Sequence, residues 1–301
     1  FFEMYYEDAE ESSHLLGLQL TRRAISGNQI PMTGVPSHAL ETYVSRFLKH
    51  NLKVAICDQI EKASERTSKK VLQRDIVRIV TPGTVTEDQL LEGNQNSFLL
   101  TVSYAYDDDL MDKLGLSWYD LSTGEFYVSE TTYANLHSEL VRISPKEIIL
   151  PYELQENEEI NQATSEFFVT VPKDSGMTYY DYSHGLKRLE DYFSNIKTFA
   201  EDFSKLELIA AGAAMRYIQE TQRMLNPRFN FPSRKGHGLS LSIDATTLKS
   251  LELMKSFTTN TKKGSLLGTL DKTVTSHGGR ELCKRLGAPL ADKEEIEKRL
   301  D

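Results

Sequence analysis

The pattern of apolar residues changes along the chain, and this change limits the folds available to it. Up to about residue 150 the apolar residues recur in short runs of strand length, separated by turn residues and short helical segments. From Tyr182 onward they recur with the period of a helix, most clearly over residues 201–224. Mixed strands and helices followed by helices alone indicate an α/β part and then an all-α part. We therefore expect a multidomain α/β protein that ends in a helical core.

Length and charge divide the chain into three predicted domains. A chain of 301 residues is long enough for two or three domains. Residues 1–90 have a net charge of −1, residues 91–200 have −12 and residues 201–301 have +4. We predict a small mixed α/β domain over 1–90, a layered α/β domain over 91–200 and the beginning of a helical core over 201–301. The acidic middle domain is expected to avoid nucleic-acid phosphates, which leaves the outer domains for a contact surface.

Turn residues and periodicity place the elements within these domains. Pro36 begins a helix at its first turn, where the missing N–H of proline costs nothing. The run Ser122-Thr123-Gly124 marks a hairpin turn. Small residues at 210–214 allow a neighbouring helix to approach closely. We predict strands over residues 18–23, 53–60, 76–80, 97–104, 114–119, 125–129, 147–150 and 239–243, and helices over 7–16, 133–143, 201–224, 246–257, 266–286 and 293–300.

The segment FFEMYYEDA at residues 1–9 is the most informative stretch for function. Side chains alternate along a strand, so Phe1 and Glu3 share one face. Phe2 and Met4 share the other face, and we expect them to point into a core. An exposed phenylalanine beside a carboxylate is uncommon on a protein surface. Taken alone, these residues favour a half-buried edge strand in which Phe1 is part of the core.

Further segments along the chain give this stretch a second interpretation. They are IPMTGVPSHA at residues 30–39, VAICDQ at 54–59, VRIVTPGT at 77–84, LELIAAG at 206–212, SIDAT at 242–246 and LDKTVTSHGGR at 270–280. In this order and at these spacings they resemble the MutS family of DNA mismatch-recognition proteins over nearly the whole chain. Ser37 departs from the tyrosine that is common at its position in the family, so any contact of that tyrosine is not carried over.

The resemblance implies a fold and a function for each predicted domain. By similarity, residues 1–90 are the mismatch-binding domain, residues 91–200 are a connector domain with a ribonuclease-H-like fold, and residues 201–301 begin the core of lever and clamp helices. The partner implied is double-stranded DNA that contains a mismatch or a small loop.

The resemblance also implies roles for three residues. In the family, the Phe and Glu of an F-x-E motif contact the mismatched base, and they correspond to Phe1 and Glu3. Met32 lies in the IPMTGVP segment, which we expect to be a loop. The family places a residue of this loop near the minor groove, and the alternative is a methionine that packs on its own domain.

Other residues suggest contacts or chemistry outside this motif. A basic segment between two predicted strands contains Lys62, Arg66, Lys69 and Lys70, which are candidate phosphate contacts, although charged runs are usually solvated. Asp120 ends a predicted strand, where a ribonuclease-H-type nuclease would hold a metal ligand. A metal-dependent nuclease is therefore one alternative function, although no set of carboxylates is placed around Asp120. A protein-interaction scaffold is the other.

The remaining expectations concern cofactors, partners and compartment. The sequence has no G-x-x-x-x-G-K-[ST] phosphate loop, so we expect no cofactor and no ATPase activity in this chain, whereas full-length family members use ATP and magnesium. No apolar run approaches the ~20 residues of a membrane span. The resemblance implies a homodimer or heterodimer formed through C-terminal regions, with downstream repair proteins as further partners. KKGSLL at 262–267 is similar to mitochondrial members from fungi, so we predict a mitochondrial location, with the bacterial cytoplasm or the nucleus as alternatives.

Overall fold

The computed structural model describes residues 1–25, 27–60, 73–86, 96–105, 110, 112–172, 178–193, 200–223, 227–235, 241, 243–259 and 261–300. The chain divides into two compact units, and each is described by itself. The first comprises Phe1–Thr81, and the second contains Pro82–Thr86 and the described residues from Asn96 onward. None of the described helices is both long and apolar enough to span a membrane.

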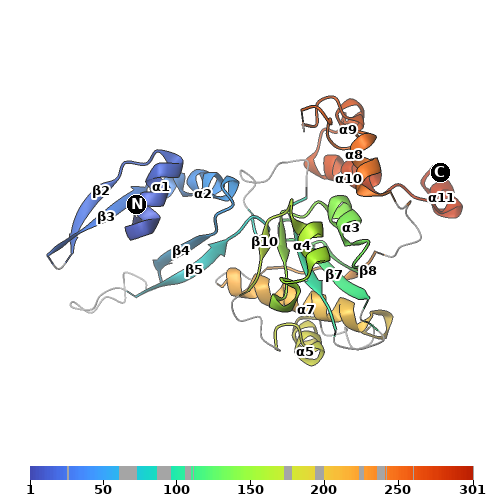
Figure 1. The fold of residues 1–301 in the computed structure, drawn as a ribbon, viewed down its shortest axis with the longest axis horizontal. Helices are drawn as coiled ribbons and strands as arrows, with labels where there is room; N and C mark the ends of the chain where they lie inside the picture. The colour runs from blue at the N-terminus through green and yellow to red at the C-terminus, as the bar shows by residue number, and fades with distance from the viewer. Residues whose placement is uncertain are drawn as a thin grey trace. The chain divides into compact units, whose positions relative to one another are not determined.

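The first unit contains a three-stranded antiparallel sheet with a helix on one face (Figure 1). Its strand order is β1 (Phe2–Tyr5), β3 (Asn28–Val35) and β2 (Thr21–Ile25). Helix α1 (Tyr6–Leu16) follows β1 directly and covers the face that carries Met4, whose sulfur accepts a hydrogen bond from Ser12 Oγ at 3.2 Å. The unit also contains the 3-10 helix η1 (Ser37–Ala39), α2 (Leu40–Lys49), and the antiparallel pair β4 (Val54–Gln59) and β5 (Arg74–Val80).

Strand β3 contains Met32, so the expected loop around this residue is wrong. A proline weakens a central strand because it has no N–H to donate to the ladder. However, β1 pairs only with residues from Met32 to Val35, so at Pro31 the strand has a neighbour on one side only, which is Arg22 of β2. Pro31 therefore occupies an edge position, where the missing donor is tolerated.

The second unit is built on a six-stranded mixed sheet with the order β10-β9-β6-β7-β8-β11. Three consecutive strands, β6, β7 and β8, form an antiparallel meander. β9 and β11 pair in parallel with its two edges, and β10 pairs in parallel with β9. This arrangement confirms the predicted layered α/β fold class. The strands are β6 (Phe98–Ser103), β7 (Lys113–Asp120), β8 (Phe126–Thr132), β9 (Glu147–Ile149), β10 (Val169–Thr170) and β11 (Ser233–Arg234).

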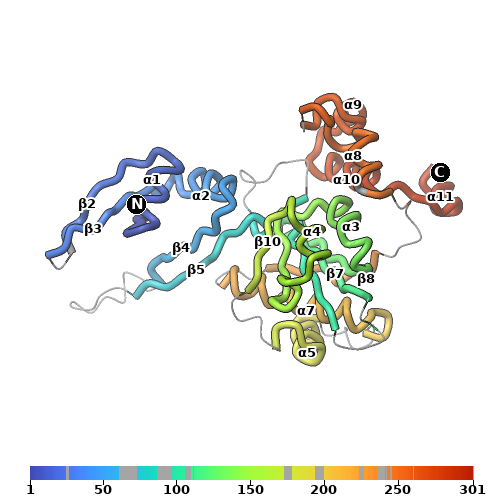
Figure 2. The backbone as a smooth tube through the Cα atoms, viewed as in Figure 1, coloured from blue at the N-terminus to red at the C-terminus, as the bar shows by residue number. Residues whose placement is uncertain are grey.

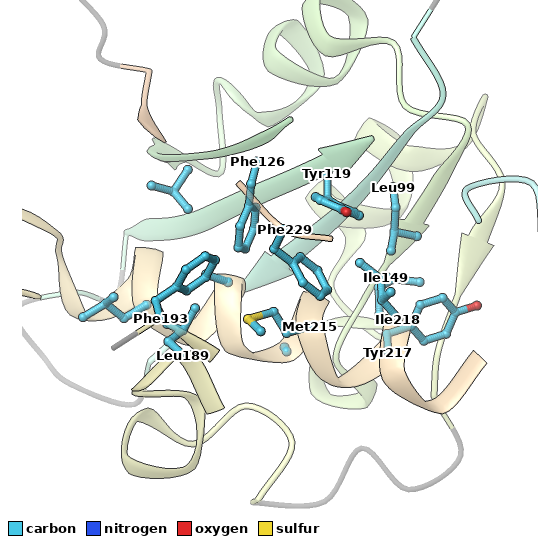
Figure 3. Packing of buried hydrophobic residues seen from close by; sticks show 14 of the residues in the cluster. Leu99, Tyr119, Phe126, Ile149, Leu189, Phe193, Met215, Tyr217, Ile218 and Phe229 are labelled. Atoms are coloured by element: carbon cyan, nitrogen blue, oxygen red, sulfur yellow. The ribbon is translucent and has the colours of Figure 1, made fainter. Parts of the chain in front are cut away.

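Helices cover both faces of this sheet. On one face α7 (Lys205–Thr221) and α5 (Tyr182–Tyr192) enclose one apolar cluster, and on the other α3 (Leu136–Ile143) and α4 (Glu158–Thr164) enclose a second. Figure 3 shows the rings of Tyr119, Phe126 and Phe229 between the sheet and α7, next to Met215. The ring centroids of Tyr119 and Phe229 are 4.7 Å apart, which is within the range of favourable aromatic pairs.

The close approach predicted from the small residues of α7 is confirmed. A Cβ atom on Gly212 would lie 2.3 Å from the Cα of Gly185 in α5. At the N-terminal end of α7, Ser103 Oγ of β6 donates to the carbonyl oxygen of Leu206 at 2.8 Å. This packing differs from the predicted boundary at residue 200, since α7 lies on the sheet and not with the helices that follow. Helical periodicity identifies the apolar face of a helix but not its neighbour.

The last part of the second unit consists of helices, which Figure 2 traces in orange and red. The prediction of one helix over 266–286 is wrong, because the helix is interrupted at residues 271–275, between α9 and α10. Asp271 accepts hydrogen bonds from the backbone N–H and hydroxyl of Thr273 at 2.9 and 2.6 Å, and Thr275 caps α10. Such local bonds compete with the helix. The helices are α8 (Ala245–Ser250), α9 (Leu266–Leu270), α10 (Ser276–Gly287) and α11 (Lys293–Leu300), and the strand predicted over 239–243 lies largely outside the described residues.

Candidate nucleic-acid interface

The sheet of the first unit has one face that α1 does not cover. Glu3 and Tyr5 lie on it, because α1 covers Met4 and side chains alternate along β1. The register places Met32 opposite Tyr5 and Thr21 opposite Met32. Residues directly opposite each other project to the same side of a sheet. We call this surface the Glu3 face; it comprises Glu3, Tyr5, Thr21, Arg23, Met32 and Gly34.

Phe1 is exposed directly before β1. The exposed fraction of this residue is 86%, so the interpretation that placed Phe1 in the core is wrong. Phe2 and Met4 are half-buried, as predicted from the alternation. An exposed phenylalanine gains nothing from folding, which makes its ring available to a ligand.

Glu3 is held by two donors on its own face. The Tyr5 hydroxyl donates to Glu3 Oε2 at 2.5 Å, and Arg23 Nη1 donates to the same oxygen at 2.8 Å. Arg23 Nη1 also donates to the Tyr5 hydroxyl oxygen at 2.6 Å. The hydrogen bond from Tyr5 and the charge of Arg23 lower the pKa of Glu3, and Glu3 in turn raises the pKa of Tyr5. Glu3 is therefore an ionised carboxylate at neutral pH.

The three predicted mismatch contacts lie on or directly before the strand pair β1 and β3. Phe1 precedes β1, Glu3 lies within it, and Met32 pairs with Tyr5 at the other end of that strand, where it is half-buried. The roles of Tyr5 and Arg23 beside Glu3 were not predicted from the sequence. The alternation in β1 could have found Tyr5, whereas Arg23 depends on the strand order. Lys62, Arg66, Lys69 and Lys70 lie outside the described residues, so their contacts with phosphates stay a prediction.

Asp120, the residue on which the nuclease alternative depends, has a structural role in the second unit. It is fully buried at the end of β7. Its carboxylate accepts hydrogen bonds from the Ser97 N–H at 3.2 Å, the Ser122 N–H at 2.9 Å and the Ser122 hydroxyl at 2.6 Å. These bonds stabilise the turn between β7 and β8. Among the described residues, no three histidine, cysteine or acidic side chains are grouped so that they could hold a metal ion.

Three family models match this chain. The model of MutS domain I matches residues 1–89, that of MutS domain II matches residues 97–230, and that of MutS domain III matches residues 246–301. The match to domain II includes α7, in agreement with the packing of this helix on the sheet.

Curated relatives align with the whole chain. The DNA mismatch repair protein MutS of Rhodopseudomonas palustris (strain HaA2) is 39% identical over 305 residues, which cover 100% of this chain and 33% of the relative. The proteins of the same name from Wolbachia pipientis wMel and Rhizobium meliloti (strain 1021) are each 37% identical over 100% of this chain, and the alignments cover 35% and 33% of those relatives. The chain thus spans about a third of the length of these relatives. With three successive domain models matched and the whole chain aligned, the chain belongs to the MutS family.

Proposed function

We propose that this chain senses mismatched or looped base pairs in duplex DNA during mismatch repair. Phe1 is the wedge that enters the helix at the defect, and Glu3 contacts the displaced base. The observation that carries this proposal is the exposed Phe1 ring, which lies two residues before an ionised glutamate on the uncovered face of the sheet. Met32 lies on that face and is the proposed minor-groove contact.

The wedge works through the deformability of DNA. Separating a base step costs a few kcal/mol, and less where pairing is already defective. An aromatic ring replaces part of the lost stacking, which contributes ~1–3 kcal/mol per base. A ring stacks on any base, so Phe1 supports recognition of many mismatches and of no particular sequence. The preference for a defect therefore comes from the energy of bending the DNA.

Glu3 adds discrimination between matched duplex and duplex that contains a mismatch. Its charge is repelled by phosphates, so it disfavours sound duplex, whereas a displaced base can donate a hydrogen bond to it. Together the ring and the carboxylate give selectivity rather than tight general binding.

The substitution Phe1→Ala in the intact protein tests the wedge. We expect the ratio of affinities for mismatched and matched duplex to fall by roughly tenfold, because the lost stacking is worth ~1–3 kcal/mol. Weak general DNA binding is expected to remain. The measurement is fluorescence anisotropy with labelled duplexes that differ in one base. Phe257→Ala is the matched control, because Phe257 of the second unit is similarly exposed, at 80%.

An unchanged ratio in the Phe1→Ala protein would refute the wedge. Equal and negligible binding of matched and mismatched duplex by the unmodified protein would instead favour the scaffold alternative.

The other properties of the intact protein are proposals that rest on the family. We propose residues 1–90 as the mismatch-binding domain and the sheet of the second unit as the connector, with Lys62, Arg66, Lys69 and Lys70 as phosphate contacts. ATP and magnesium binding, dimerisation and contacts with downstream repair proteins are assigned to the intact protein. The relatives described above are bacterial and give no support to the predicted mitochondrial location, so we propose the alternative, the bacterial cytoplasm.

A further inference from the structure

This inference rests on the proposed function. We propose that Arg23 and Tyr5 are positioning residues that hold the Glu3 carboxylate as an ionised acceptor, with one of its oxygens left for the displaced base. Glu3 and Tyr5 lie on β1, and Arg23 lies on β2. The two strands are not neighbours, since β3 lies between them.

Gly34 of β3 leaves space beside Glu3. It pairs directly with Glu3, so a side chain at this position would project beside the carboxylate. A Cβ atom on Gly34 would lie 3.0 Å from the carbonyl oxygen of Phe2 and 3.8 Å from Glu3 Cγ. Arg23 pairs with Ile30, four residues from Gly34, so it reaches Glu3 diagonally across β3. The glycine of the IPMTGVP segment leaves β3 without a side chain directly beside Glu3.

The two carboxylate oxygens of Glu3 differ in the hydrogen bonds that they accept. Both donors bind Oε2, and Oε1 accepts no hydrogen bond within the described part of the chain. The side chain of Glu3 is 36% exposed, so Oε1 remains accessible. A carboxylate fixed through one oxygen loses less conformational entropy when the other binds a ligand. Its chemistry toward a base is that of an acceptor for an N–H group.

The charges around Glu3 keep it ionised near DNA. On its own strand Tyr5 donates to it, Arg23 approaches from β2, and Arg74 of β5 adds a weaker positive charge. Strand β3 contributes no titratable side chain. Together these groups lower the pKa of Glu3. Phosphates would raise it, because a nearby negative charge favours the protonated acid. Arg23 and Tyr5 oppose that effect.

The pH profile of mismatch preference in the intact protein tests this proposal. The measurement is anisotropy with a matched duplex and with one that contains a single unpaired thymine, from about pH 5 to about pH 8. We expect the unmodified protein to show a flat preference, because Glu3 stays ionised throughout. The variants Tyr5→Phe and Arg23→Gln are expected to lose about fivefold in preference at neutral pH, as a charge-assisted hydrogen bond is lost. Their preference should fall further as the pH falls, since protonation of Glu3 removes both the acceptor and the repulsion of matched DNA.

Three further variants separate positioning from general charge effects. Arg22→Gln removes a positive charge from the neighbouring position of β2, which pairs with Pro31 on the opposite face. Its preference and flat profile are expected to match those of the unmodified protein. Arg23→Lys retains the charge and should restore most of the flat profile. Adding Glu3→Gln to Tyr5→Phe should remove the pH dependence.

The possible failures are distinguishable. If the unmodified protein prefers the unpaired thymine and Phe1→Ala abolishes that preference, while Tyr5→Phe and Arg23→Gln leave it unchanged and flat with pH, the positioning role is wrong and the proposed function stands. An equal loss in Arg22→Gln and Arg23→Gln would also overturn the positioning role. If the unmodified protein shows no preference, the proposed function itself fails.

Discussion

At the scale of the residue, Glu3 is expected to lower the affinity for sound DNA. Its ionised carboxylate lies on the face that we propose for DNA, where phosphates repel it. The cost is smaller at a defect, because a displaced base offers a hydrogen-bond donor in return. Selectivity thus depends on an interaction that weakens binding to the more abundant, matched DNA.

Glu3→Ala is therefore predicted to tighten binding to matched duplex by about threefold to tenfold at low salt, since one like-charge repulsion is removed. Glu10→Ala is the control, because Glu10 lies on α1, which covers the opposite face of the sheet. Titration of a labelled matched duplex gives the two dissociation constants. Unchanged or weaker binding by the Glu3 variant would show that its charge does not act against sound DNA.

The sequence predicted the faces of β1 but not the contact between Glu3 and Arg23. Alternation along β1 was enough to place Glu3 on one face and Met4 on the other, and Phe1 is exposed directly before the strand. The contact between Glu3 and Arg23 could not be predicted, because it depends on β3 lying between β1 and β2. That order is set by long-range pairing and is not encoded in any local pattern.

At the scale of the element, small residues at a helix crossing determine how closely two helices pack. α7 contacts α5 through Gly212 and Gly185. The run AAGAA indicated a close approach, and the strands of the meander were predicted from short apolar runs and from the turn at residues 122–124. The helix break at 271–275 was missed, because the capping bonds of Asp271 and Thr275 act over a few residues inside an otherwise helical pattern.

Gly212→Ala is predicted to destabilise the second unit by about 1–3 kcal/mol, because the added Cβ overlaps backbone and the helices must move apart. The free energy of unfolding in urea measures this effect. Gly287→Ala in α10 is the matched control, because its Cβ would lie 3.9 Å from the nearest atom, Met254 Cε. We expect the control to change stability by less than ~1 kcal/mol. Equal stability of both variants would contradict the packing described for α7.

At the scale of the whole molecule, one buried carboxylate forms hydrogen bonds with three segments of the second unit that are far apart in the sequence. Glu147 of β9 accepts hydrogen bonds from Thr170 Oγ1 at 2.6 Å, the Tyr217 hydroxyl at 2.7 Å and the Gly83 N–H at 3.1 Å. A Cβ on Gly83 would lie 2.8 Å from Leu99 Cδ1. The TPGT segment therefore serves to anchor residues 82–86 on this sheet, which explains its glycine.

Glu147→Leu is predicted to destabilise this unit by about 3–5 kcal/mol, because it leaves buried donors without their acceptor. Glu153→Leu, at an exposed position of the 3-10 helix η4 (Tyr152–Leu154), is the control and should change stability by less than ~0.5 kcal/mol. Urea unfolding followed by the fluorescence of Trp118 in β7 reports on this unit. A loss in the Glu147 variant no larger than in the control would show that the anchor is unimportant.

The bend of the DNA tests the wedge role of Phe1, because insertion of the ring and kinking of the duplex are proposed to be one event. Energy transfer between dyes at the two ends of a short duplex measures the bend. When the intact protein binds a duplex with a single mismatch, we predict that the ends draw closer, and that Phe1→Ala abolishes this change at saturating protein while Phe257→Ala preserves it. An equal bend by the Phe1→Ala protein, or tight mismatch binding without a bend, would contradict the wedge role of Phe1.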